Sequence, residues 1–271
     1  MRGTSRASLA EAKEKLDAVL AHADVAPLGA DLFGVLRLLD REHGLRRALS
    51  DPSRSGSDKA QLVRILLEGK IAAAALELVT EVVRLRWARS GDLTDGLEDL
   101  AVTAEAARAE AEGNLDDLED ELFRFSRVVE REPQLHGALG ASGLPAERKR
   151  DLLAALLEGK ATPSTILLVT EVVTRPRGRS LERGLAAYGR VVAERRQRLV
   201  ALVRTAVPLT EEQRDRVARA LSATYGHEVH LNIEIDPEVV GGMSIHIRDE
   251  VIDGTMAGRL DEVRKRLRSA N

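Results

Sequence analysis

Two lysines in repeated segments are candidates for phosphate binding. Lys70 and Lys160 each end a Leu-Leu-Glu-Gly-Lys segment. A lysine after glycine can bind nucleotide phosphates when a glycine-rich loop precedes it and Ser or Thr follows it. Neither segment has those upstream glycines or that downstream hydroxyl residue. A glycine that ends a helix beside a basic residue fits both segments better, so the sequence predicts no nucleotide site.

The histidines and hydroxyl residues predict no metal site and no catalysis. Six histidines are spread along the chain without ligand spacing: His22, His43, His136, His227, His230 and His246. His227, His230 and His246 could approach one another across a sheet, but solvent-facing strand positions are the favoured reading. Ser and Thr residues lack a matching His and Asp constellation. The chain is therefore expected to be no enzyme and to need no cofactor.

Arginines are dense between residues 179 and 204 and include the run Arg195-Arg196-Gln197-Arg198. Such a surface could bind nucleic-acid phosphates. A solvated helix face or an acidic protein partner is favoured, because the aromatic residues on which bases stack are missing. A nucleic-acid-binding helical protein that uses this surface remains the alternative function.

Composition limits the architecture and the compartment. The 271 residues are 44% apolar and 31% charged with a net charge of -3, as in soluble globular proteins of two or three domains. Only 2% are aromatic, which favours packed helices over a β-sandwich or barrel. The chain has no cysteine, in agreement with a reducing cytoplasm, and neither a signal peptide nor a membrane span is expected.

An internal duplication organises the first 198 residues. Leu66-Leu67-Glu68-Gly69-Lys70 returns 90 residues later at Leu156–Lys160, and Leu78–Val83 returns at Leu168–Val173. Apolar residues in both copies recur at helical spacing. We therefore expect a mainly α protein with two tandem helical bundles, residues 1–113 and 114–198, followed by a small α/β domain at 199–271. Residues 92–112 are expected to form a long helix between the bundles, and 179–198 another with Leu181, Leu185, Tyr188 and Val192 on one face.

The stretch from residue 199 to the C-terminus combines strand, turn and helix signals. Residues 199–207 predict a strand, and Thr210-Glu211-Glu212-Gln213 a capping box that begins a helix. Apolar and polar residues then alternate over 229–235 and 243–247, the pattern of two strands with one buried face. Gly241-Gly242 is read as a turn between them because no helix start follows that could bind an anion.

A shorter strand and a helix are expected to close the domain. Val251-Ile252 predicts the strand, and Asp253 or Thr255 could cap a helix that carries Leu260 and Val263 on one face. Ile245 is expected to face this helix, and His246 is expected to face solvent.

These C-terminal residues resemble the signature of the delta subunit of bacterial F-type ATP synthases, equivalent to the mitochondrial oligomycin-sensitivity-conferring protein. Residues 206–210 and 166–185 resemble that family less specifically. Family members have one N-terminal six-helix bundle, so the bundle at 1–113 is an extra copy, and Arg175-Pro176-Arg177 is a second departure. Long delta subunits of this kind are expected in actinobacteria. The signature residues are Asp236, Gly241, Gly242, Ile252, Asp253, Gly254, Thr255, Gly258, Arg259 and Leu260.

The resemblance implies a stator subunit without catalysis. A helical bundle would hold the N-terminal segments of alpha subunits in an apolar groove, and the C-terminal domain would bind the b-subunit stalk. The chain would then resist rotor torque during ATP synthesis, as a peripheral protein at the cytoplasmic face of the cell membrane. An unrelated helical adaptor is a third possibility.

Overall fold

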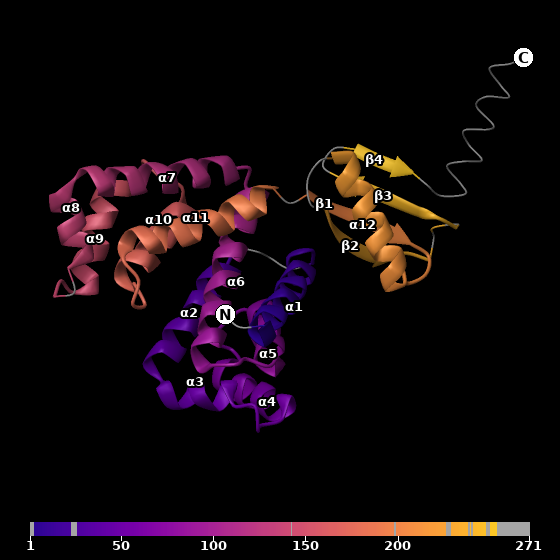
Figure 1. Ribbon diagram of the computed structural model, residues 1–271, viewed down its shortest axis with the longest axis horizontal. Helices are drawn as coiled ribbons and strands as arrows, with labels where there is room; N and C mark the ends of the chain where they lie inside the picture. Colours follow the sequence, from indigo (N-terminus) through magenta and orange to yellow (C-terminus); the bar gives the residue numbers. More distant parts are fainter. Residues whose placement is uncertain are drawn as a thin grey trace, which may run out of the picture. The chain divides into compact units, whose positions relative to one another are not determined.

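The chain divides into two compact units, Met1–Arg195 and Arg196–Asn271. The computed structural model describes residues 3–22, 26–141, 143–197, 199–225, 229–237, 239, 241–247 and 250–253. The first unit is helical and the second combines a helix with a four-stranded sheet (Figure 1). The expected fold class, mainly α with a small α/β region at the C-terminus, is confirmed.

Eleven helices are described in the first unit. They are α1 Gly3–Leu20, α2 Leu28–Arg41, α3 His43–Ser50, α4 Gly56–Leu67, α5 Ala73–Arg84, α6 Ser90–Ala111, α7 Leu115–Arg131, α8 Pro133–Gly140, α9 Ala146–Leu157, α10 Pro163–Thr174 and α11 Leu181–Gln197. The two long helices expected around residues 92–112 and 179–198 are therefore α6 and α11.

The duplication is visible in the helices themselves. Shifted by 90 residues, α3, α4 and α5 coincide with α8, α9 and α10. A long-range cap recurs as well. Asp31 Oδ2 accepts a hydrogen bond from the backbone N–H of Ala72 at 2.8 Å, and Glu121 Oε2 accepts one from Thr162 at 2.9 Å. In both copies a carboxylate thus satisfies a donor at the start of a helix, which helices leave unpaired.

The two copies share helix α6. The same shift carries α1 onto residues 93–110, which lie within α6. Helix α6 therefore ends the first bundle and also takes the place of the first helix in the second. Of its 22 residues, 15 are buried, including Leu93, Leu100, Ala104 and Ala109. Its many alanines let helices of both copies approach it closely, whereas an ordinary surface helix has only one apolar face.

One hydrophobic core runs through the whole first unit. A single cluster joins Leu16 and Phe33 of the first copy with Leu153 and Val192 of the second. The four residues expected on one face of α11 are all buried: Leu181, Leu185, Tyr188 and Val192. Residues on both sides of the expected boundary at residue 113 share this core, and the division into two bundles remains a prediction.

Helix α5 ends at Arg84, three residues before Trp87. Leu85 is extended (φ -69°, ψ 162°), and the Trp87 indole N–H donates to the Val82 carbonyl oxygen at 3.0 Å. The ring is buried against Gly96 of α6, where an added Cβ would lie 2.6 Å from a ring carbon. Burial of the ring explains why the chain leaves the helix early.

The glycines before the two lysines end helices, as the sequence predicted. Gly69 and Gly159 have φ values of 72° and 69°, in the left-handed region that glycine adopts at low cost. The backbone N–H groups of Lys70 and Lys160 donate to the carbonyl oxygens of Leu67 and Leu157. Both lysines thus follow ordinary helix ends.

The second unit has a β-α-β start followed by a hairpin. Its elements are β1 Leu199–Thr205, α12 Glu211–Tyr225, β2 Val229–Ile235, β3 Met243–Ile247 and β4 Glu250–Asp253. The strand order is β2-β1-β3-β4; β1 and β2 are parallel, and the other two pairings are antiparallel. The predicted capping box is confirmed, since Gln213 N–H donates to Thr210 Oγ1 at 3.3 Å and Thr210 N–H to Gln213 Oε1 at 2.9 Å.

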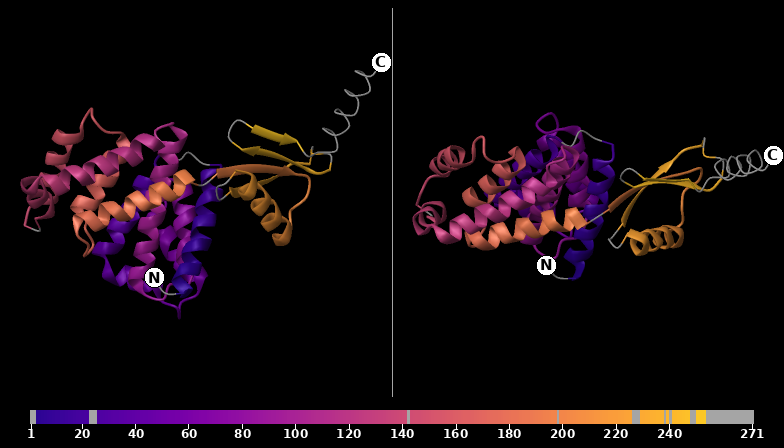
Figure 2. Two further views of the ribbon diagram at one scale, coloured as in Figure 1. Left: turned by 45° about the horizontal axis from the view of Figure 1, so that its top comes forward. Right: turned by 90° about the horizontal axis from the view of Figure 1, so that it is seen from above.

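The core of the second unit lies between one sheet face and α12 (Figure 2). Ala201, Val203, Ile245 and Ile247 are buried in one cluster with Leu221 of α12. Ile245 is thus buried as expected, whereas the helix expected to face it, with Leu260 and Val263, lies outside the described residues. His246 points to the other face and is half-buried, where it was expected to be exposed, and its ring nitrogen lies 3.2 Å from Ser244 Oγ.

Candidate interaction surfaces

Three signature residues, Asp236, Gly241 and Gly242, build the reversal between β2 and β3. The Asp236 backbone N–H donates to the Thr205 carbonyl oxygen, Val239 N–H to Asp236, and Gly241 N–H to Val239, at 2.9 to 3.1 Å. Gly241 and Gly242 have φ values of 67° and 84°, which non-glycine residues rarely adopt. The turn reading of the glycine pair is confirmed.

The remaining signature residues lie at or beyond the last described strand. Ile252 pairs with Ile245 across β3 and β4 and is 42% exposed, and Asp253 pairs with Ser244. Val251 beside it is 59% exposed. Apolar side chains at this edge are one candidate contact surface. Gly254, Thr255, Gly258, Arg259 and Leu260 lie outside the described residues.

Three arginines of the arginine-rich stretch are paired with carboxylates. The Arg195 guanidinium, 9% exposed, lies 2.8 Å from Glu110 and 3.2 Å from Asp17. Arg179 pairs with Glu98, and Arg204 with Glu234 at 2.9 Å. Because these carboxylates already neutralise the three cations, Arg179, Arg195 and Arg204 have less charge to offer to phosphates. The nucleic-acid alternative is therefore not supported.

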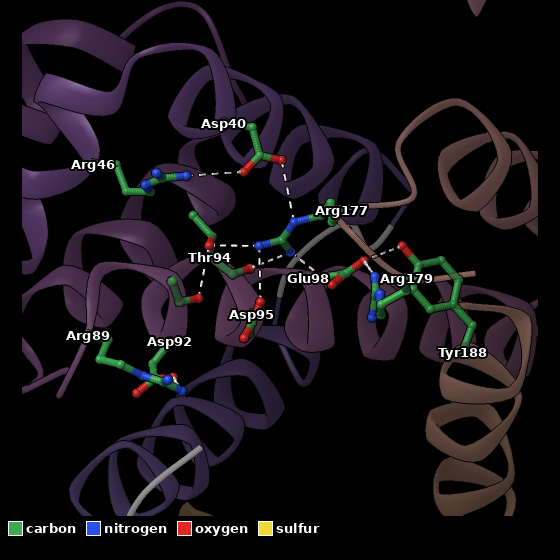
Figure 3. Close-up of polar contacts among 11 residues, drawn as sticks. Asp40, Arg46, Arg89, Asp92, Thr94, Asp95, Glu98, Arg177, Arg179 and Tyr188 are labelled. Atoms are coloured by element: carbon green, nitrogen blue, oxygen red, sulfur yellow. Dashed lines mark hydrogen bonds and ion pairs between the residues drawn. The ribbon is translucent and has the colours of Figure 1, made fainter. Parts of the chain in front are cut away.

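Glu98 of α6 gathers side chains from the α10–α11 loop and from α11 (Figure 3). Its carboxylate lies 2.8 Å from Arg177, contacts Arg179, and accepts a 2.9 Å hydrogen bond from the Tyr188 hydroxyl. Burial, reinforced by the negative charge of Glu98, raises the pKa of Tyr188 well above its ordinary value. The phenol therefore stays protonated and continues to donate.

Arg177 connects this cluster to the first copy. Its guanidinium donates to the carbonyl and hydroxyl oxygens of Thr94 at 3.2 and 2.7 Å, and lies 3.5 Å from Asp40 of α2 (Figure 3). Its backbone has a φ of 49°, the one left-handed value among the described non-glycine residues. Such a conformation persists where surrounding contacts determine it. Arg177 had been noted in the sequence only as a departure from the family pattern.

A buried carboxylate forms a second contact between the copies. Glu105 of α6 is fully buried and accepts a 3.1 Å hydrogen bond from Ser164 of α10. Its Oε1 has no hydrogen-bond partner among the described residues and would lie 2.4 Å from a Cβ placed on Gly29. Burial raises the pKa of this carboxyl, although Arg108 and Ser164 oppose the shift. Its position inside α6 gave no signal in the sequence beyond an acidic residue among alanines.

A groove lies between α6 and α11 beside Glu98, with a volume of about 490 Å³. Its charged lining includes Asp95 and Asp99 but also Arg179 and Arg190. With both signs present, the groove favours no particular ion. Nor do the described residues contain a cluster of three metal-ligand side chains. None of the described helices combines the length and the apolar character needed to cross a membrane.

Comparison with known proteins separates most of the first copy from the rest of the chain. The model of the family described as ATP synthase delta (OSCP) subunit matches residues 101–267. Its match begins inside α6 and covers the second copy and the C-terminal unit, which leaves most of the first copy outside.

Curated relatives match over nearly the full length. The ATP synthase subunit delta of Thermobifida fusca is 51% identical over 267 residues, 98% of this chain and 99% of that one. Those of Streptomyces griseus and Kineococcus radiotolerans are 47% and 48% identical, each over 98% of this chain and 99% and 97% of theirs. The first copy is thus shared by these relatives. On the evidence of the family model and of these identities, the chain belongs to the ATP synthase delta (OSCP) subunit family.

Proposed function

We propose that this chain is the peripheral-stalk subunit that links the catalytic head of an F-type ATP synthase to its stator and takes no part in the chemistry. Family membership along nearly the whole chain carries this proposal. The side chains support it, because charged groups such as Glu98, Arg177 and Arg195 are engaged in packing helices together rather than arranged around a reacting atom. The chain acts as a peripheral protein held at the membrane by the complex.

The two units divide the binding between them. The helical unit holds the N-terminal segments of alpha subunits, and the C-terminal unit binds the b subunit. The exposed apolar side chains Val251 and Ile252 at the edge strand support the second assignment, since exposed apolar groups are typical of binding surfaces. A linker that resists torque needs well-packed units, and the continuous core of the helical unit provides one.

Reconstitution tests the proposal. The full chain is added to an ATP synthase preparation from which this subunit has been removed. We expect it to rebind stoichiometrically and to restore ATP synthesis coupled to proton flow. Rebinding should leave hydrolysis by the isolated head unchanged. Failure to rebind would contradict the proposal.

A second measurement tests the absence of a nucleotide site. Calorimetric titration of the purified chain with Mg-ATP should give no saturable heat, because neither glycine-lysine segment forms a phosphate-binding loop. Saturable binding would contradict a purely structural role.

A further inference from the structure

The duplication provides an internal comparison between equivalent surfaces. Shifted by 90 residues, α2 corresponds to α7, Phe33 to Phe123, and Arg37 to Arg127. Phe33 is fully buried, whereas Phe123 is 66% exposed. Val128, one turn along from Phe123, is also exposed, and apolar side chains grouped on a surface are typical of interaction sites. Two residues of common origin therefore differ in whether their side of the helix is covered.

The second copy covers the α2 surface. The ring of Phe33 lies 6.3 Å from that of Tyr188 in α11, between centroids, and Arg37 Nη1 lies 2.5 Å from Glu171 Oε1 in α10. In Figure 1, α10 and α11 lie between α7 and helices α1 to α5. They cover the side of α2 that bears Phe33, whereas α7 packs against α6 and α10 and buries Leu122 and Phe125 in the shared core.

The equivalent face of α7 is open. We call it the outer face of α7 and define it by Asp120, Phe123, Arg124, Arg127 and Val128, which share one side of the helix. Val128 is 47% exposed, and the Arg127 side chain is 51% exposed. Among the described residues, its guanidinium pairs with Glu130, one turn along, at 3.1 Å. Such an exposed pair contributes little and can be exchanged for a better-buried partner.

We propose that the outer face of α7 is a docking surface for a helix of another ATP synthase subunit. The occupant carries an aromatic or large aliphatic side chain that packs on Phe123 and a carboxylate that pairs with Arg127. The arrangement on α2, where Tyr188 and Glu171 make those two contacts, defines this chemistry. The inference rests on the proposed function, because it takes the partner from the same complex.

Other occupants fit the observations less well. Within each chain, α2 already occupies the α10–α11 surface that could cover the outer face of α7. A second copy of the chain therefore has no free surface of this kind. A membrane surface is disfavoured, since Asp120 and Glu130 flank the exposed ring and would lose hydration without a partner. A helix with one carboxylate and one large apolar residue suits the mixture of charges.

Cysteine accessibility tests the proposal, because the natural chain contains no cysteine. Phe123→Cys places one thiol on the outer face of α7. Ile65→Cys places a control thiol at an exposed apolar position of α4, where Ile65 is 71% exposed. In the free chain, both thiols should react with a maleimide at similar rates. In ATP synthase rebuilt with each variant, we expect the rate at residue 123 to fall at least tenfold relative to that at residue 65. An unchanged ratio would overturn the proposal.

Substitutions of Arg127 test the chemistry of the occupant. Arg127→Glu should weaken rebinding to the depleted complex at least tenfold, whereas Arg127→Lys should keep most of the affinity. The free variants should melt like the parent chain, because residue 127 is exposed. Equal affinities for the Glu and Lys variants would overturn the charge assignment. A parent chain that fails to rebind would instead contradict the proposed function, so the two failures are distinguishable.

Discussion

At the residue scale, single side chains of the second copy hold the first copy in place. Arg177 reaches Thr94, Glu98 and Asp40, which lie on two helices of the first copy. Glu105 contributes a buried carboxylate at the same junction. Removing one partner of a buried pair usually costs more than the pair contributes, because the remaining charge stays buried. These residues therefore give the clearest tests of how the copies are joined.

Substitutions of Arg177 separate side-chain contacts from backbone conformation. Arg177→Ala should lower the free energy of unfolding by about 3 kcal/mol, since it removes a partner of the buried Glu98. Arg177→Gly loses the same contacts, but it should be about 1 kcal/mol more stable than the Ala variant because glycine tolerates the φ of 49°. Urea unfolding measures both. Equal stabilities would show that residue 177 is not left-handed in solution.

Glu105→Gln should stabilise the protein at neutral and higher pH. Burial raises the pKa of Glu105, so the Glu105 carboxyl holds its proton more tightly in the folded state than in the unfolded chain. Protonation of Glu105 therefore adds to the free energy of unfolding below the unfolded pKa, and this contribution is lost as pH rises through the folded pKa. The Gln variant should therefore melt above the parent at pH 8, with the difference shrinking toward pH 4. Glu77→Gln, at an exposed position of α5, is the control. Parallel pH profiles for parent and Glu105→Gln would contradict the prediction.

At the element scale, helix α6 and the small sheet differ in how much of their surface is buried. Helix α6 is buried around most of its circumference because two bundles share it. The sheet buries one face against α12 and leaves hydrophobic residues of its last strand, Val251 and Ile252, exposed. One element thus unites the helical unit, and the other presents a surface to a partner.

Ile245→Asp should unfold the C-terminal unit without unfolding the helical one. Ile245 is 8% exposed in the cluster with Leu221, and a buried unpaired carboxylate costs several kcal/mol. Binding to the b subunit should be lost, while binding of an alpha N-terminal peptide and the helical melting transition persist. Circular dichroism and pull-down assays measure these outcomes.

His246→Asp is the matched control on the neighbouring residue. The ring of His246 is half-buried and near Ser244 on the opposite face, so the change should cost less than about 1 kcal/mol. If Ile245→Asp bound b like the parent, the assignment of the b contact to this unit would be wrong.

At the scale of the whole molecule, the duplication does not give two equivalent domains. The first copy has six described helices, α1 to α6, whereas the second has α7 to α11 and uses α6 as its first helix. The compact units accordingly divide at Arg195 and Arg196, after both copies. The copies should therefore differ in whether they fold alone.

Fragments test this asymmetry. Residues 1–113 should be helical and melt cooperatively, at a lower temperature than the full chain because Phe33 loses its cover. Residues 114–198 should remain largely unfolded, whereas residues 90–198, which include α6, should fold. Circular dichroism of the three fragments decides the matter. A folded 114–198 fragment would show that the second copy does not depend on α6.

Local patterns in the sequence determined most of the elements and the family. The period-2 alternation predicted β2 and β3, and Thr210 with Gln213 predicted the cap of α12. The repeat predicted matching helices, and the C-terminal signature indicated the family that the comparisons establish. These features depend on neighbours within a few residues, or on common ancestry, so the amino-acid order is sufficient to reveal them.

Tertiary structure alone decided how the copies fit together. Phe33 and Phe123 both follow leucine on an amphipathic helix, yet the first is fully buried and the second is exposed, because the second copy covers only Phe33. Nor does the sequence pair Arg195 with Asp17 or Arg177 with Glu98, although Arg195 belongs to the arginine-rich stretch that suggested a nucleic-acid surface. Burial and charge pairing depend on which surfaces meet, and these residues meet across 79 to 178 positions of the chain.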